Sequence, residues 1–438
     1  MALPGAVLAQ RPWDGPSLWA ARALFCPMQL LVAAPLLLFL LTLTAMLLRH
    51  PDVQFYEIDR VMFGVLVVAV VLSSMIRRQR LLVFDRITWP MLGLTLMAFL
   101  GAVSQPFDHE IWSLLASKFV VPFTMFYLAG HVFTEEKDFR KFEIFILLVL
   151  AYLSFTAIAF LCGAHSLIFP RFILDESLGF HADRARGPLL QAVANGVSLN
   201  ILGLLAVHAY RRGSVRGKKV VLLLATVPVA ILATMTRAVW LSFAGSIVAL
   251  IVLSRNKALR RVCAAAAIVV AGGAAILLST DHVFESLSER LEERGPIDYR
   301  AAVYAGGWEM FLQRPWVGWG FHQMPAELPK HVSGYNEKVL YPHNTYLELA
   351  VEHGLVGIAL YAWLMWELWR LRRGGIPARE KAGFLDHRFH ILWAVILAVY
   401  WMNAAVVVMS YQFVNGLLFS VAGMLAAQRR RAREVPAC

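Results

Sequence analysis

The sequence predicts an all-α polytopic integral membrane protein with about twelve transmembrane helices and one large loop that contains short helices. Of its 438 residues, 59% are hydrophobic and only 16% are charged, and the mean hydropathy is +0.61. Globular domains are about 45–50% apolar, so a soluble chain of this size would need far more polar surface. The apolar runs approach the ~20 residues that a helical span requires, which favours helices over a β-barrel.

Apolar runs divide the chain into a series of predicted spans. Residues 1–28 precede the first span, nine spans fill residues 29–280, a large loop covers 281–342, three spans fill 343–427, and 428–438 form a basic tail. The twelve predicted spans are residues 29–48, 61–76, 87–103, 111–130, 142–162, 188–209, 219–235, 237–253, 262–279, 344–369, 389–408 and 411–427.

Basic residues set the expected orientation. With twelve spans, the segments rich in Lys and Arg all fall on one side of the membrane, which makes that side and both termini cytoplasmic. The net charge of +12 is therefore explained by topology, and we expect contact with membrane lipids and no nucleic acid. These segments are residues 77–86, 211–219, 255–261, 370–388 and 429–433.

The large outer loop is predicted to contain two helices. Asp281 could cap the first, which would run to about residue 293 and stop at Gly295-Pro296. Asp298 could cap the second, which would end near residue 313, before Pro315. On the second helix one face carries Arg300, Tyr304, Trp308 and Phe311, so this helix could lie in the outer interface.

The strongest candidate for a general base is His343, which stands where the outer loop meets the tenth span. An unperturbed His pKa of ~6.5 suits proton abstraction near neutrality. Asn344 follows it, and Glu348 and Glu352 come within the next turns, where ionisable groups at membrane depth are costly. The alternative is that this stretch merely marks the interfacial end of a helix.

Three arginine sites face the same side. Arg184 and Arg186 precede the sixth span, Arg237 lies in the tight turn before the eighth, and Arg300 is on the loop helix. Guanidinium groups bind phosphate oxygens bidentately and keep their charge, so a cluster suits a membrane-bound diphosphate. The alternative is that each arginine pairs with a nearby carboxylate or a lipid head group.

Two further polar residues lie inside predicted spans. Lys118 could contact an anionic substrate or extend its amine to the interface. Asn195 could orient a substrate oxygen or bond a neighbouring helix.

Motif absences narrow the chemistry. The chain has no DxD, GxxxxGK[ST], GxSxG or HExxH, which argues against a nucleotide-sugar enzyme, an ATPase, an elbow-type hydrolase and a zincin. The four cysteines are scattered, and neither they nor the loop carboxylates have the spacing of a metal site. We expect no metal and no cofactor.

Four segments, taken in order, resemble the O-antigen ligase and polymerase superfamily over roughly residues 180–370. The most informative is His343-Asn344-Thr345-Tyr346-Leu347-Glu348, followed by Gly354-Leu355-Val356-Gly357. The others are Arg186-Gly187-Pro188 with Asn195, Thr236-Arg237-Ala238-Val239-Trp240, and Arg300 with Trp308, Pro315, Gly318, Trp319 and Gly320.

The resemblance implies a metal-independent glycosyltransferase at the periplasmic face of a Gram-negative inner membrane. Its donor would be a glycan on undecaprenyl diphosphate, and the chain length and single large loop look most like the ligase, whose acceptor is lipid A–core. The alternatives are an O-antigen polymerase, a protein O-oligosaccharyltransferase and a non-enzymatic lipid-linked glycan transporter, although a transporter would tend to line a path across the bilayer with charge.

The resemblance also implies roles for individual residues. His343 would take the proton from the acceptor hydroxyl while arginines stabilise the departing diphosphate, and a single displacement would invert the anomeric carbon. No paired outer carboxylates suggest a covalent intermediate. The implied catalytic residues are His343, Arg237 and Arg186, and the implied substrate-binding residues are Arg184, Arg300, Asn195, Asn344, Tyr304, Trp308 and Lys118.

Overall fold

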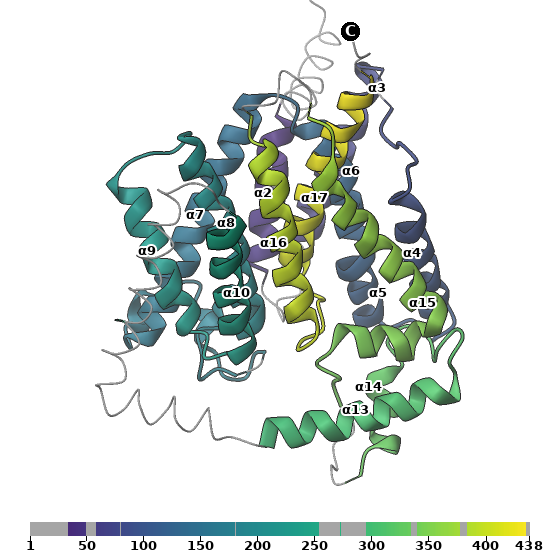
Figure 1. Ribbon diagram of the computed structural model, residues 1–438. Coiled ribbons are helices and arrows are strands. Elements are labelled where there is room, and N and C mark those ends of the chain that lie inside the picture. Colours follow the sequence, from purple (N-terminus) through teal and green to yellow (C-terminus); the bar gives the residue numbers. More distant parts are fainter. Residues whose placement is uncertain are drawn as a thin grey trace, which may run out of the picture.

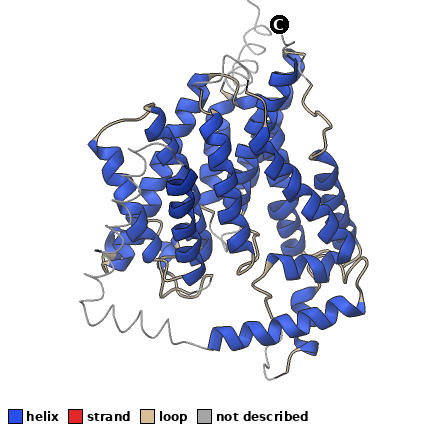
Figure 2. Cartoon of the chain, viewed as in Figure 1, coloured by secondary structure: helices blue, strands red, loops and turns tan. Residues whose placement is uncertain are grey.

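The computed structural model describes residues 34–49, 58–78, 80–179, 181–253, 272, 295–333, 340–376 and 383–434. Within these residues the regular structure is entirely helical and contains no strand, which confirms the predicted fold class (Figure 2). Most helices stand side by side as an upright bundle (Figure 1). Five of the described helices are long and apolar enough to cross a membrane.

Helices occupy eleven of the twelve predicted spans. The number twelve remains a prediction, because the ninth span, 262–279, lies outside the described residues apart from Gly272, as does the helix predicted for 281–293. The helices are α2 (Pro35–Leu47), α3 (Ile58–Ile76), α4 (Thr88–Val103), α5 (His109–Leu115) with η1 (Ala116–Val120) and α6 (Val121–Val132), α7 (Glu136–Leu161), α8 (Ala192–Arg212), α9 (Lys218–Leu232), α10 (Arg237–Leu253), α15 (Thr345–Arg370), α16 (His387–Ala404) and α17 (Gln412–Glu434).

The centre of the bundle consists of α8 and α17, whose residues are almost all buried. Helix α17 packs along α6, and α16 contacts both α8 and α10. The segment predicted as a basic tail begins as the last turns of α17, which continues to Glu434. The predicted tight turn between the seventh and eighth spans is also present, because α9 ends at Leu232 and α10 begins at Arg237.

Helix α13 (Gly295–Gln313) lies crosswise under one end of the bundle (Figure 1). It ends at the predicted residue but begins three residues earlier than Asp298, because Gly295 and Pro296 belong to its first turn, where proline is well tolerated. Its buried side chains, among them Val303 and Met310, form a small core with the α15 residues Ala350 and Val351.

The face of α13 predicted from the sequence has a mixed environment. Phe311 is buried, but Trp308 projects outward and is 56% exposed. After α13 the chain forms a tight turn, the short helices α14 (Met324–Glu327) and η5 (Leu328–His331), and then reaches α15.

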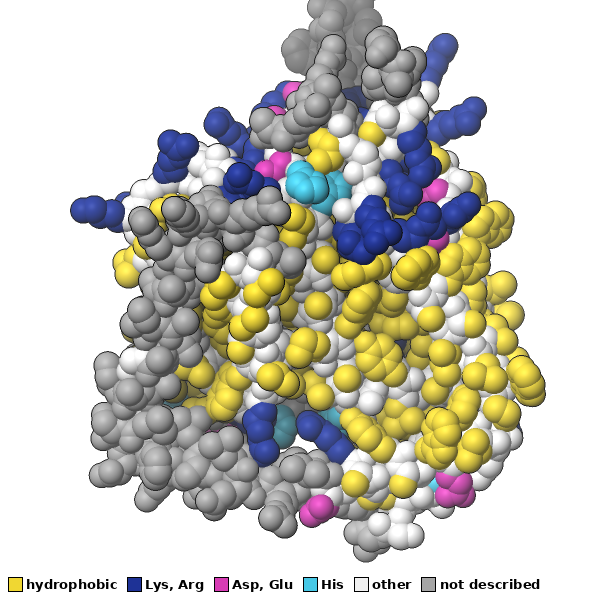
Figure 3. Space-filling model, viewed as in Figure 1, with side chains coloured by type: hydrophobic (Ala, Val, Ile, Leu, Met, Phe, Trp, Pro, Cys, Tyr) yellow, Lys and Arg dark blue, Asp and Glu magenta, His cyan; other side chains and the backbone are white. Residues whose placement is uncertain are grey.

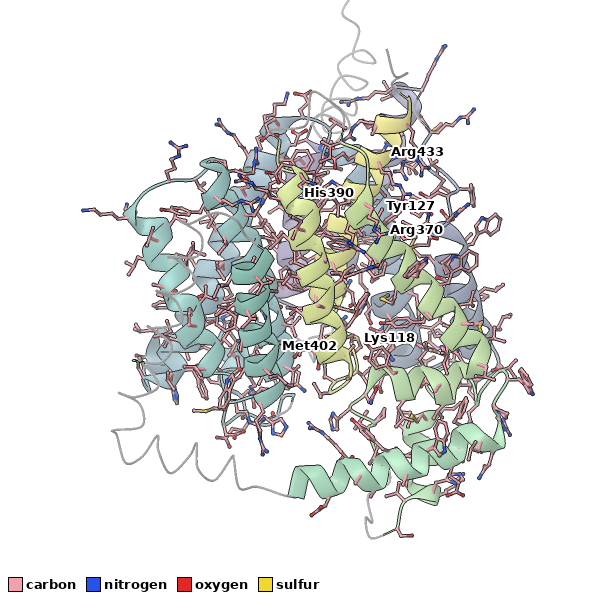
Figure 4. The ribbon with its side chains drawn as sticks, viewed as in Figure 1. Lys118, Tyr127, Arg370, His390, Met402 and Arg433 are labelled. Atoms are coloured by element: carbon pink, nitrogen blue, oxygen red, sulfur yellow. The ribbon has the colours of Figure 1, made fainter. Side chains whose placement is uncertain are left out.

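The two ends of the bundle differ in charge. Lys and Arg side chains crowd the end opposite α13 (Figure 3), and Arg370 and Arg433 lie at that end (Figure 4). The end beside α13 has a hollow in which Lys or Arg and His side chains lie close together (Figure 3).

Candidate functional site

His343 lies in a sharp turn at the entrance to α15. Its φ of 45° is in the left-handed region, which non-glycine residues seldom adopt and which occurs often at functional sites. Asn344 then caps the helix, since its Oδ1 accepts hydrogen bonds from the amides of Tyr346 (2.9 Å) and Leu347 (3.2 Å). The cap fixes where α15 begins and so fixes the position of His343.

The surroundings of His343 are aromatic and positively charged. Its ring centroid lies 6.1 Å from that of Tyr299 on α13. Burial, reinforced by the positive charges of Arg300 and His181, lowers the pKa of His343 to about 4. At neutral pH the imidazole is therefore uncharged, which leaves one ring nitrogen able to accept a proton.

The first segment of α15, residues 345–353, is tied to the loop between α16 and α17. Thr345 Oγ1 donates to the carbonyl of Val407 (2.8 Å) and accepts from the amide of Met409 (3.0 Å). The hydroxyl of Tyr346 donates to the carbonyl of Trp401 (2.9 Å). These bonds hold the residues that follow His343 against the last two helices.

The other end of this first segment is a break in α15 at Gly354, where the backbone is not helical. A broken helix leaves unpaired amides and carbonyls, which are costly at membrane depth unless they find partners. The turn formed by residues 315–320, called here the 315–320 turn, supplies them. Four backbone hydrogen bonds join the two: Trp319 N to Val351 O (2.8 Å), Gly320 N to Glu352 O (3.0 Å), Leu355 N to Pro315 O (2.8 Å) and Val356 N to Trp316 O (3.2 Å).

Two glycines allow this close approach. A Cβ atom on Gly318 would lie 2.4 Å from the carbonyl carbon of Glu352, and one on Gly354 would lie 2.5 Å from the carbonyl carbon of Trp316. Both glycines also have positive φ, 74° and 61°. The 315–320 turn therefore holds the break at a fixed place.

Arg186 is buried, with 1% of its surface exposed. Its Nε donates to the carbonyl of Ile173 (3.0 Å), and its terminal nitrogens donate to the carbonyls of Leu178 and Asp175. Burial lowers the pKa of the guanidinium, while nearby acidic residues oppose that shift. The arrangement favours a role in fixing residues 173–178 before α8, so its predicted place at a diphosphate stays a prediction that this geometry does not support.

Asn195 supports the same region. Its Nδ2 donates to the carbonyl of Ala185 (2.8 Å), so it bonds the segment that leads into its own helix. Arg184, one residue earlier, has its Nε 3.5 Å from the carboxylate of Asp183. Arg237 is exposed at the first position of α10. Of the predicted arginines, Arg300 is the one whose charge acts on His343.

The predicted substrate-binding residues on α13 differ from one another in environment. The hydroxyl of Tyr304 donates to the carbonyl of Ala405 (3.3 Å) at the end of α16. This bond ties the crosswise helix to the bundle. Trp308 is exposed, and its ring is tilted against that of the buried Phe311, with ring centroids 5.1 Å apart.

Lys118 lies in the half of the bundle nearest α13 (Figure 4). Its Nζ is 2.8 Å from Oε1 of Glu348, and both side chains are about nine-tenths buried. The amine is therefore largely shielded from solvent, and the pair joins α15 to the α5–η1–α6 span.

The sequence matches the family model described as O-antigen ligase over residues 220–362. This range contains Arg237, α13, the 315–320 turn and His343 with the first segment of α15. The match over these residues supports membership of the O-antigen ligase superfamily. No curated protein matches the chain.

The match indicates, in general terms, a glycosyltransferase-type membrane enzyme that uses a lipid-linked glycan and a lipid acceptor. Three of the four resembling segments differ in what the structure shows them to do. Residues 315–320 and 354–357 build the break in α15, and Arg186 and Asn195 hold the approach to α8. His343 and Arg300 remain as neighbouring groups available for chemistry.

Sequence reasoning missed two features of the site. The proximity of His181 to His343 had no local signal, because 162 positions separate them. The Lys118–Glu348 ion pair did have a signal in the sequence, since opposite charges inside two apolar spans are expected to pair with each other. Among the described residues no group of three or more His, Cys, Asp or Glu is placed to hold a metal ion.

Proposed function

We propose that the protein transfers O-antigen glycan from undecaprenyl diphosphate to a sugar hydroxyl of lipid A–core, with His343 as general base. The observation that carries the proposal is the position of His343, which sits in a left-handed turn between α13 and α15 beside Arg300. The superfamily match supports glycan transfer in general, and the ligase reaction is the inference made here.

The depressed basicity of His343 has a chemical consequence. In the protein without bound donor, the imidazole of His343 has a pKa of about 4 and therefore holds an abstracted proton poorly at neutral pH. A donor diphosphate bound beside Arg300 would place negative charge near the ring, offset the charges of Arg300 and His181, and raise that pKa. The base would then become effective only when the donor is in place, with a pKa closer to the working pH.

The arginines would bind the leaving group. Arg300 lies beside His343, and Arg237 and Arg184 are the other predicted outer arginines whose side chains are not buried against carbonyls as Arg186 is. Guanidinium groups would neutralise the charge that develops on the diphosphate as the glycosidic bond breaks. Proton transfer to His343 and bond formation at the anomeric carbon would complete an inverting displacement.

The orientation follows from the charged ends of the bundle. We place the end crowded with Lys and Arg in the cytoplasm, according to the positive-inside rule, and α13 with His343 at the periplasmic face of the inner membrane (Figure 3). A lipid-borne donor and a lipid-borne acceptor could both reach His343 there without leaving the bilayer.

The test is a reconstituted assay with purified protein in liposomes, a defined carrier-linked glycan and purified lipid A–core. We expect glycan on lipid A–core from the wild-type protein, loss of at least ~100-fold in rate for His343→Gln because a general base typically contributes that much, and wild-type rate for His165→Gln, a matched change at an exposed outer histidine. Longer carrier-linked chains with unmodified lipid A–core would identify a polymerase instead. Full transfer by His343→Gln would rule out the assigned base.

A further inference from the structure

The Lys118–Glu348 ion pair lies outside the groups that the proposed reaction uses. It connects residues 230 positions apart, and each partner sits within a helix that is long and apolar enough to cross the membrane. Taking two charges out of water costs several kcal/mol per ion before their attraction is counted. A buried pair of this kind therefore calls for a specific role.

Local backbone geometry brings Lys118 to its partner. The five residues of η1, Ala116–Val120, form a π turn between α5 and α6. Such turns insert one residue into a helix and occur frequently at functional sites. The Lys118 amine sits 5.5 Å from the centroid of the Phe321 ring, just after the 315–320 turn, so the same lysine contacts the first segment of α15 and the residue that follows the turn.

Glu348 lies midway along this first segment. The break at Gly354 is held by backbone bonds to the 315–320 turn, and the N-terminal end is held by the side chains of Thr345 and Tyr346. These bonds lie at the two ends of the segment, and the charged side chain of Glu348 adds a contact at its middle that opposes rotation of the segment about its axis. Among the described residues, the ion pair that involves this segment is the one with Lys118.

A small cavity and a second buried acidic residue lie beside the Lys118–Glu348 pair. The cavity is about 50 Å³ and is lined by Lys118, Glu348, Glu352 and Tyr361, among others. Glu352 follows Glu348 by one helical turn, is 2% exposed, and its Oε1 has no hydrogen-bond partner among the described residues. Removal of Lys118 would therefore leave Glu348 without its cation, beside a second buried acidic side chain.

We propose that Lys118 and Glu348 are positioning residues that set the rotation of the first segment of α15 and thereby aim His343 at the acceptor hydroxyl. The proposal rests on the proposed function for its kinetic consequence. It differs from the role first expected of Lys118, because the buried amine is bonded to Glu348.

The experiment compares Lys118→Met, Glu348→Met and the double variant with wild type. Misplacement of a reacting group by about 1 Å can cost ~100-fold, so each single variant should lower kcat by about 100-fold with the KM for the donor unchanged. The double variant removes both members of the pair and should recover kcat by at least roughly tenfold over either single variant, since a buried pair is replaced with less loss than a single charge is stranded.

A second measurement does not depend on catalysis. Hydrogen exchange at the amides of residues 346–350 should be faster in each single variant and return toward wild type in the double variant. The matched control is the buried pair between Arg212 and Glu143 at the opposite end of the bundle, 2.8 Å apart. Arg212→Met should change thermal stability and leave both the exchange at residues 346–350 and kcat unchanged.

Several results would overturn the inference. Wild-type exchange and kcat in Lys118→Met would show that the pair does not position α15. A raised donor KM in Lys118→Met that the double variant does not repair would make Lys118 a ligand of the diphosphate. If the wild-type protein transferred no glycan, the proposed function would fail, while the exchange measurement alone would still decide whether the pair holds the segment.

Discussion

Replacing Gly354 with alanine should break the site without touching a reactive group. The residue has φ of 61° and ψ of −160°, a combination essentially restricted to glycine, and forcing alanine into such a region costs about 1–3 kcal/mol. The new Cβ would also lie 2.5 Å from the carbonyl carbon and oxygen of Trp316. Because these are backbone atoms, they can move away only if the 315–320 turn shifts.

That shift would weaken the two hydrogen bonds that the amides after Gly354 donate to the carbonyls of Pro315 (2.8 Å) and Trp316 (3.2 Å). Each such bond contributes about 1 kcal/mol, so we expect a total destabilisation of ~3–5 kcal/mol. The first segment of α15 would lose its fixed end, and His343 would lose its position relative to α13.

The assay is thermal unfolding in detergent micelles at one scan rate, together with glycan transfer in liposomes. Gly64→Ala is the matched control, because a Cβ there meets nothing within 4 Å and alanine favours the α3 helix. We expect a lower unfolding temperature and a large loss of transfer for Gly354→Ala, and neither for the control. Equal stability and equal activity in the two variants would refute the account of the break.

Three further outcomes are expected. The value of kcat/KM should fall as pH drops through about 4, since the pKa of His343 in the free protein is lowered to about 4. The fall of kcat on the acid side should lie at higher pH, because the bound diphosphate stabilises the imidazolium. A fall of kcat/KM near pH 6.5 would contradict the buried, positively charged setting of His343. Arg186→Lys should lower stability by about 2–4 kcal/mol, because the donors of an ammonium all lie on one nitrogen and cannot reach the three carbonyls that the separate guanidinium nitrogens contact, and should leave the donor KM unchanged; a raised KM would restore Arg186 to the diphosphate. Asn344→Ala should cost about 1 kcal/mol by thermal unfolding and Asn344→Asp much less, since aspartate can cap the same amides, and equal losses in the two would show that the cap is not what Asn344 supplies.

Features with a short-range cause could be predicted from the sequence. Apolar runs give helices wherever the structure describes them, and the end of α13 at Gln313 follows from Pro315. The beginning of α13 could not be placed as well, because Gly295-Pro296 can either stop one helix or open the next. Periodicity groups Tyr304, Trp308 and Phe311 on one face of α13, but how much of each is buried depends on the contacts with α15, and Trp308 stays exposed.

Residues recognised by pattern were harder to assign to a role. Arg186 and Arg300 are equally plausible phosphate ligands when only residue type and membrane side are known. The structure separates them, because Arg186 is enclosed by three carbonyls of residues 173–178 and the charge of Arg300 acts on His343. That distinction depends on how a loop folds over a side chain, which no local pattern encodes.

Several residues in the segments that resemble the superfamily position the site and do not react. A residue type can be required at a position because it reacts or because it places something that reacts. Gly318, Gly354 and Asn344 have steric or hydrogen-bonding reasons for their identity that would hold whatever sugar is transferred. The left-handed turn at His343 is possible because its neighbours hold the chain on both sides. The position of the imidazole therefore depends on the break in α15 at Gly354, eleven residues later, and on a lysine from a different span. Substitutions that change the preference for acceptor or donor should therefore lie in α13 and in the loop near His181, which face His343 and do not form the break in α15.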